Sequence, residues 1–355
     1  MEAFARPFRF LIFSILLMWA LYYAQGVLVP LCFGGLLSML FAPLCRKMEA
    51  KGVRRGLAAL ACVLLFLLII GGIIFLLSWQ FNDLAKDITG IEQKVKGFIK
   101  EFRQYIQQTF GISEQQQQKL MEQQQSSGGG KIAGVVSDAV GSLFSVMVNF
   151  VLVVVYCFLL LFYRTHIKAF ILKISGASNK EKAESIIKKA GSVAQQYITG
   201  LSLMIVCLWV LYGIGFSIVG VKHAIFFAIL CGLLEIVPFV GNITGTSLTI
   251  ISSFAQGGEI NIVIGILVTY GIIQFFQTYI LEPLVVGAEV NINPLITILV
   301  LVIGEALWGI GGMVLAIPLT GIIKIICDHV DVLKPYGFLL GKSVAKSKER
   351  KKRNA

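Results

Sequence analysis

Apolar residues along this chain are gathered into runs of roughly 20 residues, with short charged segments between them. A helix needs a run of about this length to cross the hydrocarbon core of a bilayer. The run at 63–77, VLLFLLIIGGIIFLL, is apolar on every face, whereas a strand of a membrane barrel alternates apolar and polar positions. The pattern therefore predicts an all-α fold, that of a polytopic integral membrane protein with about eight hydrophobic helices.

The first apolar block, 8–44, would measure about 55 Å as one helix, far more than one crossing requires. Gly26 and Pro30 offer a break, so we expect a helical hairpin here. A third helix is expected at 57–79, and together these helices form a predicted N-terminal transmembrane unit, 1–79.

The next segment, 80–131, is polar and rich in glutamine. The stretch from QQQQ (115–118) to SSGGG (126–130) has the composition of a flexible linker. Before it, apolar residues recur at alternating spacings of 4 and 3, which predicts an amphipathic helix that packs against another helix, with candidate contacts at Leu84, Ile88, Ile91, Val95, Phe98, Phe102 and Tyr105. We therefore expect a polar helical insertion outside the cytoplasm.

The remainder of the chain is expected to form a transmembrane core, 132–341, and a basic tail, 342–355. A fourth hydrophobic helix is predicted at about 139–163. The segment 164–197 is basic and has one apolar helical face, which is typical of a helix on the cytoplasmic membrane surface.

Charge supports this arrangement, because only 14% of residues are charged and 57% are hydrophobic. The net charge of +12 could indicate a nucleic-acid partner, but the basic residues cluster beside the ends of apolar runs. Such clusters mark cytoplasmic loops and contacts with anionic lipid. We therefore expect the lipid bilayer and no nucleic acid as a partner, and both termini in the cytoplasm.

Two apolar runs, 224–255 and 295–326, have 32 residues each and would be about 48 Å long as straight helices. Each carries one central glutamate, Glu235 or Glu305, followed by a break that contains glycine. Each run is either one tilted, broken span, giving eight crossings in all, or a re-entrant hairpin, giving six crossings and two hairpins. We favour the hairpins, because each half-run has the length of a re-entrant helix.

A carboxylate at membrane depth costs several kcal/mol unless it is paired, hydrated or protonated. Glu235 and Glu305 are therefore candidate sites for coupling or coordination, although either could instead cap a broken helix. Non-helical backbone at this depth lines a cavity or is buried in protein. Transporters place substrate where broken helices meet, so the backbone near both breaks is a candidate substrate pathway, at Pro238, Gly241, Asn242, Gly245, Gly311 and Gly312.

The segment 280–294, ILEPLVVGAEVNINP, connects the two regions. Glu282 is a further candidate coupling residue, and Glu282 with Pro283 is expected to end a helix. Asn293 is a candidate N-cap for the last run. The other interpretation is a structural linker, defined by Pro283, Gly287, Asn293 and Pro294.

Several kinds of chemistry lack their motif in this sequence. There is no GxxxxGK[ST] loop, no GxSxG and no HExxH, so we expect neither an ATP-driven pump nor an enzyme, and no cofactor. Residues 328–331, DHVD, lack the spacing of a zinc helix, so no metal site is expected. The seven cysteines lie in or beside apolar runs, without a CxxC pair, and are expected to be small buried hydrophobic residues.

Three stretches carry a resemblance to a known family: EIVPFVGNITG (235–245), ILEPLVVGAEVNINPLITIL (280–299) and GEALWGIGGMVLAIPLTGIIKII (304–326). They resemble the autoinducer-2 exporter family of bacterial membrane proteins, although Asn242 stands where members often have proline. The resemblance implies a homo-oligomeric secondary transporter of the bacterial inner membrane. It would export a small polar solute such as a quorum-sensing signal, or act as an antiporter that exchanges cations with protons. A passive channel and a non-transporting membrane scaffold are the alternatives.

Overall fold

The computed structural model describes residues 2–79, 132–176, 179–238, 240–255, 260–286 and 292–342. These ranges are almost wholly helical and contain no strand, apart from an isolated bridge between Ile292 and Gly341. Within them, 6 helices are long and apolar enough to cross a membrane: Gln25–Ala50, Arg55–Trp79, Val146–Ile174, Lys180–Val219, Ile260–Leu281 and Pro294–His329. The prediction of an all-α polytopic membrane protein is therefore confirmed. The predicted insertion at 80–130 and the tail beyond residue 342 lie outside the described residues.

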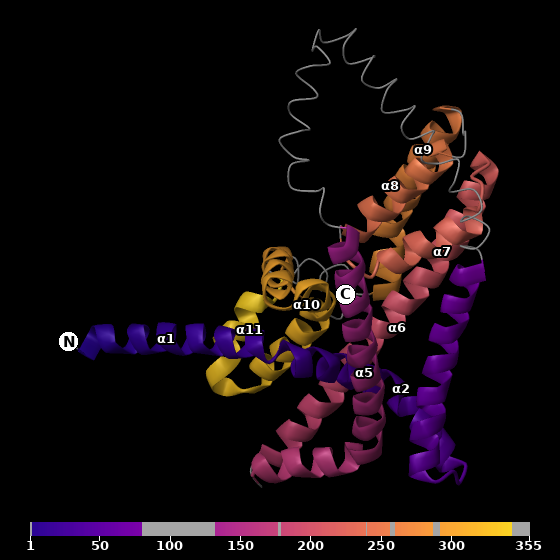
Figure 1. Ribbon diagram of the computed structural model, residues 1–355. Coiled ribbons are helices and arrows are strands. Elements are labelled where there is room, and N and C mark those ends of the chain that lie inside the picture. Colours follow the sequence, from indigo (N-terminus) through magenta and orange to yellow (C-terminus); the bar gives the residue numbers. More distant parts are fainter. Residues whose placement is uncertain are drawn as a thin grey trace, which may run out of the picture.

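The first two helices, α1 (Glu2–Tyr23) and α2 (Gln25–Ala50), are separated by Ala24 alone. Backbone hydrogen bonds continue across the junction, because the Ala24 amide donates to the Ala20 carbonyl at 2.9 Å. Gly26 and Pro30 both lie inside α2, so the predicted hairpin was wrong. Proline is tolerated inside helices of membrane proteins, where local adjustments satisfy the freed backbone groups. In Figure 1, α1 extends in line with the start of α2, and only its N-terminal part lies away from the other helices.

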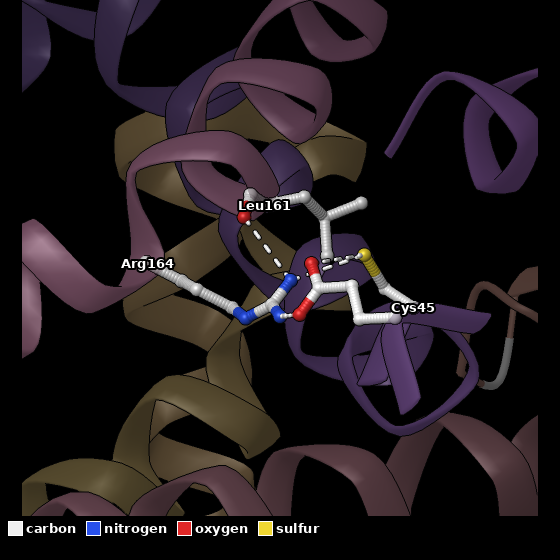
Figure 2. A network of polar contacts seen from close by, with 4 residues as sticks. Cys45, Leu161 and Arg164 are labelled. Carbon is white, nitrogen blue, oxygen red and sulfur yellow. Dashed lines mark hydrogen bonds and ion pairs between the residues drawn. The ribbon is translucent and has the colours of Figure 1, made fainter. Parts of the chain in front are cut away.

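The end of α2 packs with the helix Arg55–Trp79 and with α5 (Ile132–Ile174). Cys45, Cys62 and Cys157 are buried in this contact and behave as the small apolar residues that the sequence predicts. Figure 2 shows Arg164 of α5 directed toward α2, where it donates to Cys45 Sγ at 3.0 Å and pairs with Glu49. This half-buried ion pair fixes α5 to the end of α2.

The central element is α6 (Lys180–Val219), which contacts α7 (Ala224–Leu234), α9 (Ile260–Phe276), the π-helix η2 (Gln277–Val286) and α10 (Pro294–His329). The predicted surface helix at 164–197 is instead divided between the end of α5 and the start of α6, because the chain turns at Gly176 with φ 72°. The sequence predicts one apolar face in its second half. Of that face, Ile186 and Ile187 are half-buried, and the other members are buried: Ala190, Val193, Ala194 and Tyr197.

Two short elements follow α10 and bring the chain back to the start of this helix. A short 3-10 turn, η4 (Asp331–Leu333), leads to α11 (Lys334–Leu340), which folds back so that the Asn293 amide donates to the Leu340 carbonyl at 2.8 Å. Lys182 at the start of α6 pairs with Asp331 at 3.4 Å. The basic start of α6 is thereby attached to the end of α10.

Candidate functional site

The first long apolar run forms two helices, α7 and α8 (Val240–Ala255), which lie antiparallel and in contact. Three close approaches define the pairing. A Cβ on Gly241 would lie 1.6 Å from the Leu234 carbonyl oxygen, and one on Gly245 would lie 2.9 Å from Cys231 Sγ. Cys231 Sγ also lies 3.7 Å from Thr249 Oγ1. Glycine at these positions allows the two helices to touch immediately after the break.

The break follows from the local sequence. Proline at 238 has no amide hydrogen and cannot continue the hydrogen bonding of α7. The preceding amides of Ile236 and Val237 form short turns instead, donating to the Leu233 and Leu234 carbonyls at 3.1 and 2.9 Å. Glu235 is thus held at the C-terminal end of α7, where α7 gives way to the turn.

The Glu235 carboxylate faces the junction of α9 and η2. Gln277, the first residue of η2, donates its side-chain amide to Glu235 Oε1 at 2.6 Å. One turn earlier, Gln274 accepts a hydrogen bond from the Asn242 side chain and donates to Thr278 Oγ1 at 3.3 Å. A π-helical turn often occurs at a functional site in membrane and soluble proteins, and here it presents Gln277 to the carboxylate.

The inner face of α8 is polar. Asn242, Thr246, Thr249 and Ser253 follow one another at spacings of 4, 3 and 4 residues, which places them on one side of the helix. All four are buried, while the opposite side exposes apolar residues such as Ile243, at 65%. This is the reverse of a helix in a soluble protein, and it is expected where a membrane helix turns a hydrophilic wall inward and its apolar side to lipid.

Several side-chain oxygens on this face of α8 and on Gln277 of η2 are buried without a hydrogen-bond partner. They are Asn242 Oδ1, Thr246 Oγ1, Ser253 Oγ and Gln277 Oε1. Such atoms are uncommon in native proteins, because an unsatisfied buried polar group costs about 1–3 kcal/mol. The helices α7, α8, α9 and η2 contain no lysine or arginine. The site is therefore rich in acceptor oxygens, and the acidic side chain that meets Gln277 in it is Glu235.

The second long apolar run is α10, which is broken at Trp308 and Gly309. Gly309 has φ 58° and ψ −142°, a conformation that essentially only glycine adopts. A Cβ on Gly312 would lie 1.9 Å from the Gly304 carbonyl oxygen, although eight residues of straight helix would hold these positions about 12 Å apart. The two halves of α10 therefore fold back on each other, and Figure 1 shows α10 as two pieces rather than one long rod.

The surroundings of this second break are different. Glu305 is exposed on the first half of α10. Trp308 Nε1 donates to the Leu21 carbonyl of α1 at 2.9 Å, and a Cβ on Gly311 would lie 3.2 Å from Val29 of α2. The packing of α10 is against α2, α6 and α11 rather than against α7 or α8. The structure therefore does not join the two predicted glutamates in one buried cluster.

The residues predicted in the connecting segment have mixed outcomes. Glu282 and Pro283 were expected to end a helix, but η2 continues through both of them to Val286, so that prediction was wrong. The physical reason is the wider π-helical turn, which accommodates proline locally. Gly287 lies outside the described residues. Asn293 caps α10 as predicted, since its Oδ1 accepts from the Leu295 amide at 3.0 Å and Pro294 occupies the first turn.

The residues at 328–331 have other partners. Asp328 pairs with Lys324 at 2.5 Å, Asp331 with Lys334 at 2.6 Å, and His329 Nε2 lies 2.9 Å from Lys189 Nζ. Among the described residues, no group of three or more histidine, cysteine, aspartate or glutamate side chains could hold a metal ion.

Five polar residues of this site were not predicted from the sequence: Gln274, Gln277, Thr246, Thr249 and Ser253. The polar spacing on α8 could have indicated its inner face, because the four residues recur with helical periodicity inside an apolar run. The pairing of Glu235 with Gln277 has no such signal, since 42 residues separate the two positions.

Comparison with known proteins gives these features a context. Several relatives cover most of this chain, and three of them show the degree of similarity. YrrI of Bacillus subtilis is 22% identical over 330 residues, which cover 90% of this chain and 92% of YrrI. YueF of the same organism is 25% identical over 310 residues, which cover 83% of this chain and 82% of YueF. PerM of Escherichia coli K12 is 24% identical over 310 residues, which cover 86% of this chain and 87% of PerM. The names of the first two assign them provisionally to transport, and that of PerM assigns it provisionally to the permeases.

A family model decides the assignment. The model described as "AI-2E family transporter" matches residues 10–331, which include every helix of the site and both broken segments. The match agrees with the helical membrane architecture and with the resemblance that the sequence motifs carry. This chain therefore belongs to the AI-2E transporter family.

Proposed function

We propose that this membrane transporter is a secondary transporter whose substrate or coupling ion passes the site formed by α7, α8 and η2. The observation that supports the proposal is the polar inner face of α8, which meets the Glu235–Gln277 pair at the α7–α8 break. Intramembrane carboxylates of this kind mark ion pathways and proton relays. Glu235 is the coupling residue in this proposal.

The species moved is proposed from the family resemblance. It is either a small polar solute like autoinducer-2, which is exported, or a cation that is exchanged with protons. Backbone groups at Pro238, Gly241, Asn242 and Gly245 would face the substrate beside Glu235.

A second contribution is proposed at α10. Glu305 is exposed on the isolated chain, and an ionised carboxylate facing lipid hydrocarbon would be costly. Glu305 therefore faces a water-filled cavity or a second copy of the chain, with Gly311 and Gly312 shaping the adjacent backbone. Glu282 in η2 is a further candidate, on the same helix as Gln277.

We also propose that α7–α8 and α10 are re-entrant hairpins in a bacterial inner membrane, with both termini in the cytoplasm. The antiparallel contact of α7 with α8 supports this arrangement. Single cysteines at Lys222 and Gln256, in a background without other reactive cysteines, provide the test. A hairpin makes both accessible to an impermeant thiol reagent from the same side, whereas a single span makes them accessible from opposite sides.

Homo-oligomerisation is proposed as well. The helix α1 touches α2 and α10 near its C-terminal end and exposes apolar side chains such as Phe13 and Trp19 at more than half of their surface. A second copy is the proposed occupant of this face. Cross-linking between Trp19→Cys side chains in native membranes should give covalent dimers, and a face covered by lipid alone would give none.

Transport itself is tested in liposomes. Purified protein should carry candidate solutes or cations only when a proton or sodium gradient is imposed, and Glu235→Gln should abolish that coupling. Flux that persists without any gradient would support a passive channel. A correctly folded protein with no flux, whose cellular role survives Glu235→Gln but not deletion of 84–105, would support a scaffold.

A further inference from the structure

We propose that Cys45 is a site of reversible oxidation by hydrogen peroxide, and that Cys62 closes a disulfide with the oxidised sulfur. Arg164 and Glu49 assist the reaction. The site lies where α2, α5 and the helix Arg55–Trp79 pack together. The proposal goes beyond transport and does not depend on it, because it uses none of the residues assigned to the transport site.

The thiol of Cys45 is fully buried and has charged neighbours. Arg164 Nη1 donates to Cys45 Sγ at 3.0 Å, and the thiol donates to Glu49 Oε1 at 3.7 Å. The guanidinium is held in turn by its ion pair with Glu49 and by the Leu161 carbonyl at 3.4 Å, which Figure 2 shows on the same side as Cys45. Reactive cysteines lie beside cationic side chains, whereas cysteines in apolar surroundings are inert. These contacts therefore distinguish Cys45 from a purely structural cysteine.

The contacts assign a role to each charged group. Glu49 accepts the thiol proton, and Arg164 stabilises the thiolate, which is the form that attacks a peroxide oxygen. The O–O bond then breaks, and one oxygen stays on the Cys45 sulfur as a sulfenic acid. The other oxygen leaves as hydroxide, which takes up the proton from Glu49 and becomes water. Since 22% of the Arg164 side chain and 26% of the Glu49 side chain are exposed, polar groups connect the buried thiol with solvent.

Cys62 is the neighbouring thiol that completes the reaction. It is fully buried on the next helix, and its thiol lies within hydrogen-bonding reach of the Cys45 thiol. The Cys62 sulfur attacks the sulfenic acid sulfur, an S–S bond forms, and the Cys62 proton leaves with the hydroxyl group as a second water. Two thiols have then lost two electrons and two protons, and one peroxide has become two waters. The disulfide joins α2 to the following helix and removes the thiol that Arg164 contacts.

The position of the site fits a reversible modification. The proposed orientation places this end of α2 in the cytoplasm, because the adjoining segment 46–55 is basic. Disulfides in that compartment are usually transient and redox-sensing rather than structural. Complete burial of the Cys45 thiol keeps bulky reagents away, so a small oxidant such as peroxide is the class that suits it.

Oxidation can be followed on the full-length protein in lipid nanodiscs. The protein is treated with hydrogen peroxide, denatured in N-ethylmaleimide and digested, and mass spectrometry then quantifies each cysteine. Cys45 and Cys62 should become linked at a rate at least tenfold above the loss of the free Cys231 thiol. Cys231 is the internal control, because it is also buried but has the Thr249 hydroxyl as its contact, at 3.7 Å. Dithiothreitol should restore both linked thiols.

A matched pair of substitutions tests the role of Glu49. Glu49→Gln keeps the side-chain shape and removes the proton acceptor, so the rate of Cys45 oxidation should fall at least tenfold. Glu184→Gln makes the same change in an exposed carboxylate that pairs with Lys168 of α5, and should change the rate less than twofold. Thermal unfolding establishes that both variants are folded. Equal oxidation rates in the two variants would overturn the role of Glu49.

The variant Cys62→Ser separates the two chemical steps. Sulfenic acid at Cys45 should then persist and be captured by dimedone added with the denaturant, whereas the wild-type protein should give the disulfide. The proposal is overturned if Cys45 is oxidised no faster than Cys231, or if oxidised Cys45 forms no bond to Cys62 in the wild-type protein. Both of these comparisons remain decisive if Glu49→Gln does not fold.

Discussion

The two broken segments of this protein have the same sequence plan and different surroundings. In each, a glutamate precedes a break rich in glycine, within an apolar run of 32 residues. At α7–α8, the carboxylate meets Gln277 and a buried polar face. At α10, Glu305 is exposed, and the break packs through Trp308 and Gly311 on α1 and α2.

The difference follows from where each glutamate stands relative to its break. Glu235 ends α7 and is therefore held by the turn beside η2, whereas Glu305 lies within a helical turn before Trp308 and projects from the outside of α10. A glutamate and a break therefore do not define a site by themselves. The neighbouring helix determines whether the carboxylate has polar partners.

The largest expected effect tests whether α10 is folded back at all. Gly312→Val would drive a side chain into the Gly304 carbonyl, so we expect a loss of more than about 3 kcal/mol in stability and little folded protein. Gly241→Val should have the same result at α7–α8. Fluorescence-detected gel filtration and thermal unfolding provide the measurement. The control is Gly26→Ala, because a Cβ at this position would meet no atom within 4 Å. A well-folded Gly312→Val protein would mean that α10 is a continuous helix.

The next effect concerns the two carboxylates. Glu235→Gln should reduce gradient-coupled transport at least tenfold, because it removes the titratable carboxyl group that Gln277 contacts. Glu305→Gln should reduce transport about threefold, since this side chain is exposed and is not held by a buried polar face as Glu235 is, within the part of the chain that the structure describes. Initial rates in liposomes, normalised to folded protein, measure both variants. Equal losses would remove the functional difference between the two breaks.

Two tryptophans, Trp209 and Trp308, each attach one broken segment to a neighbouring helix. Trp209 Nε1 donates to the Ile229 carbonyl at 3.1 Å and fixes α7 to α6, whereas Trp308 Nε1 fixes α10 to α1 at 2.9 Å. Replacing either with phenylalanine should cost about 1 kcal/mol, seen as a lower Tm, because one hydrogen bond is lost. Trp209→Phe should also reduce transport more than Trp308→Phe does, because it displaces α7. A larger transport defect in Trp308→Phe would contradict the assignment of the site to α7–α8.

The smallest effect is electrostatic and belongs to the C-terminal end of α10. Hydrogen bonds from Lys334 and then Lys182 hold the pKa of Asp331 below its usual value. A lowered pKa contributes stability above the pKa of the unfolded chain, about 3.9, and that contribution is lost as pH falls through the lower folded value. Tm should therefore decrease slightly more below about pH 4 in the wild type than in Asp331→Asn, and 1 M salt should reduce this difference. An identical pH dependence in both proteins would show that the pair contributes nothing.

Much of the fold could be predicted from hydropathy and local chemistry. The long apolar runs predict membrane helices, the Asn293–Pro294 pair predicts the start of α10, and the glycine-rich segments predict both breaks. The hairpin expected at Gly26 and Pro30 failed because intrinsic propensity is a weak constraint on a helix that can retain its hydrogen bonds across the junction.

The sequence by itself therefore determined the class of protein, the positions of the breaks and the family, since these depend on local composition and short motifs. The contact of Glu235 with Gln277, across 42 residues of sequence, and the exposed position of Glu305 depend instead on tertiary packing. Contacts between distant segments depend on which helix faces pack together. Those faces are selected by the fit of glycine, tryptophan and buried polar side chains between helices, which no single segment encodes.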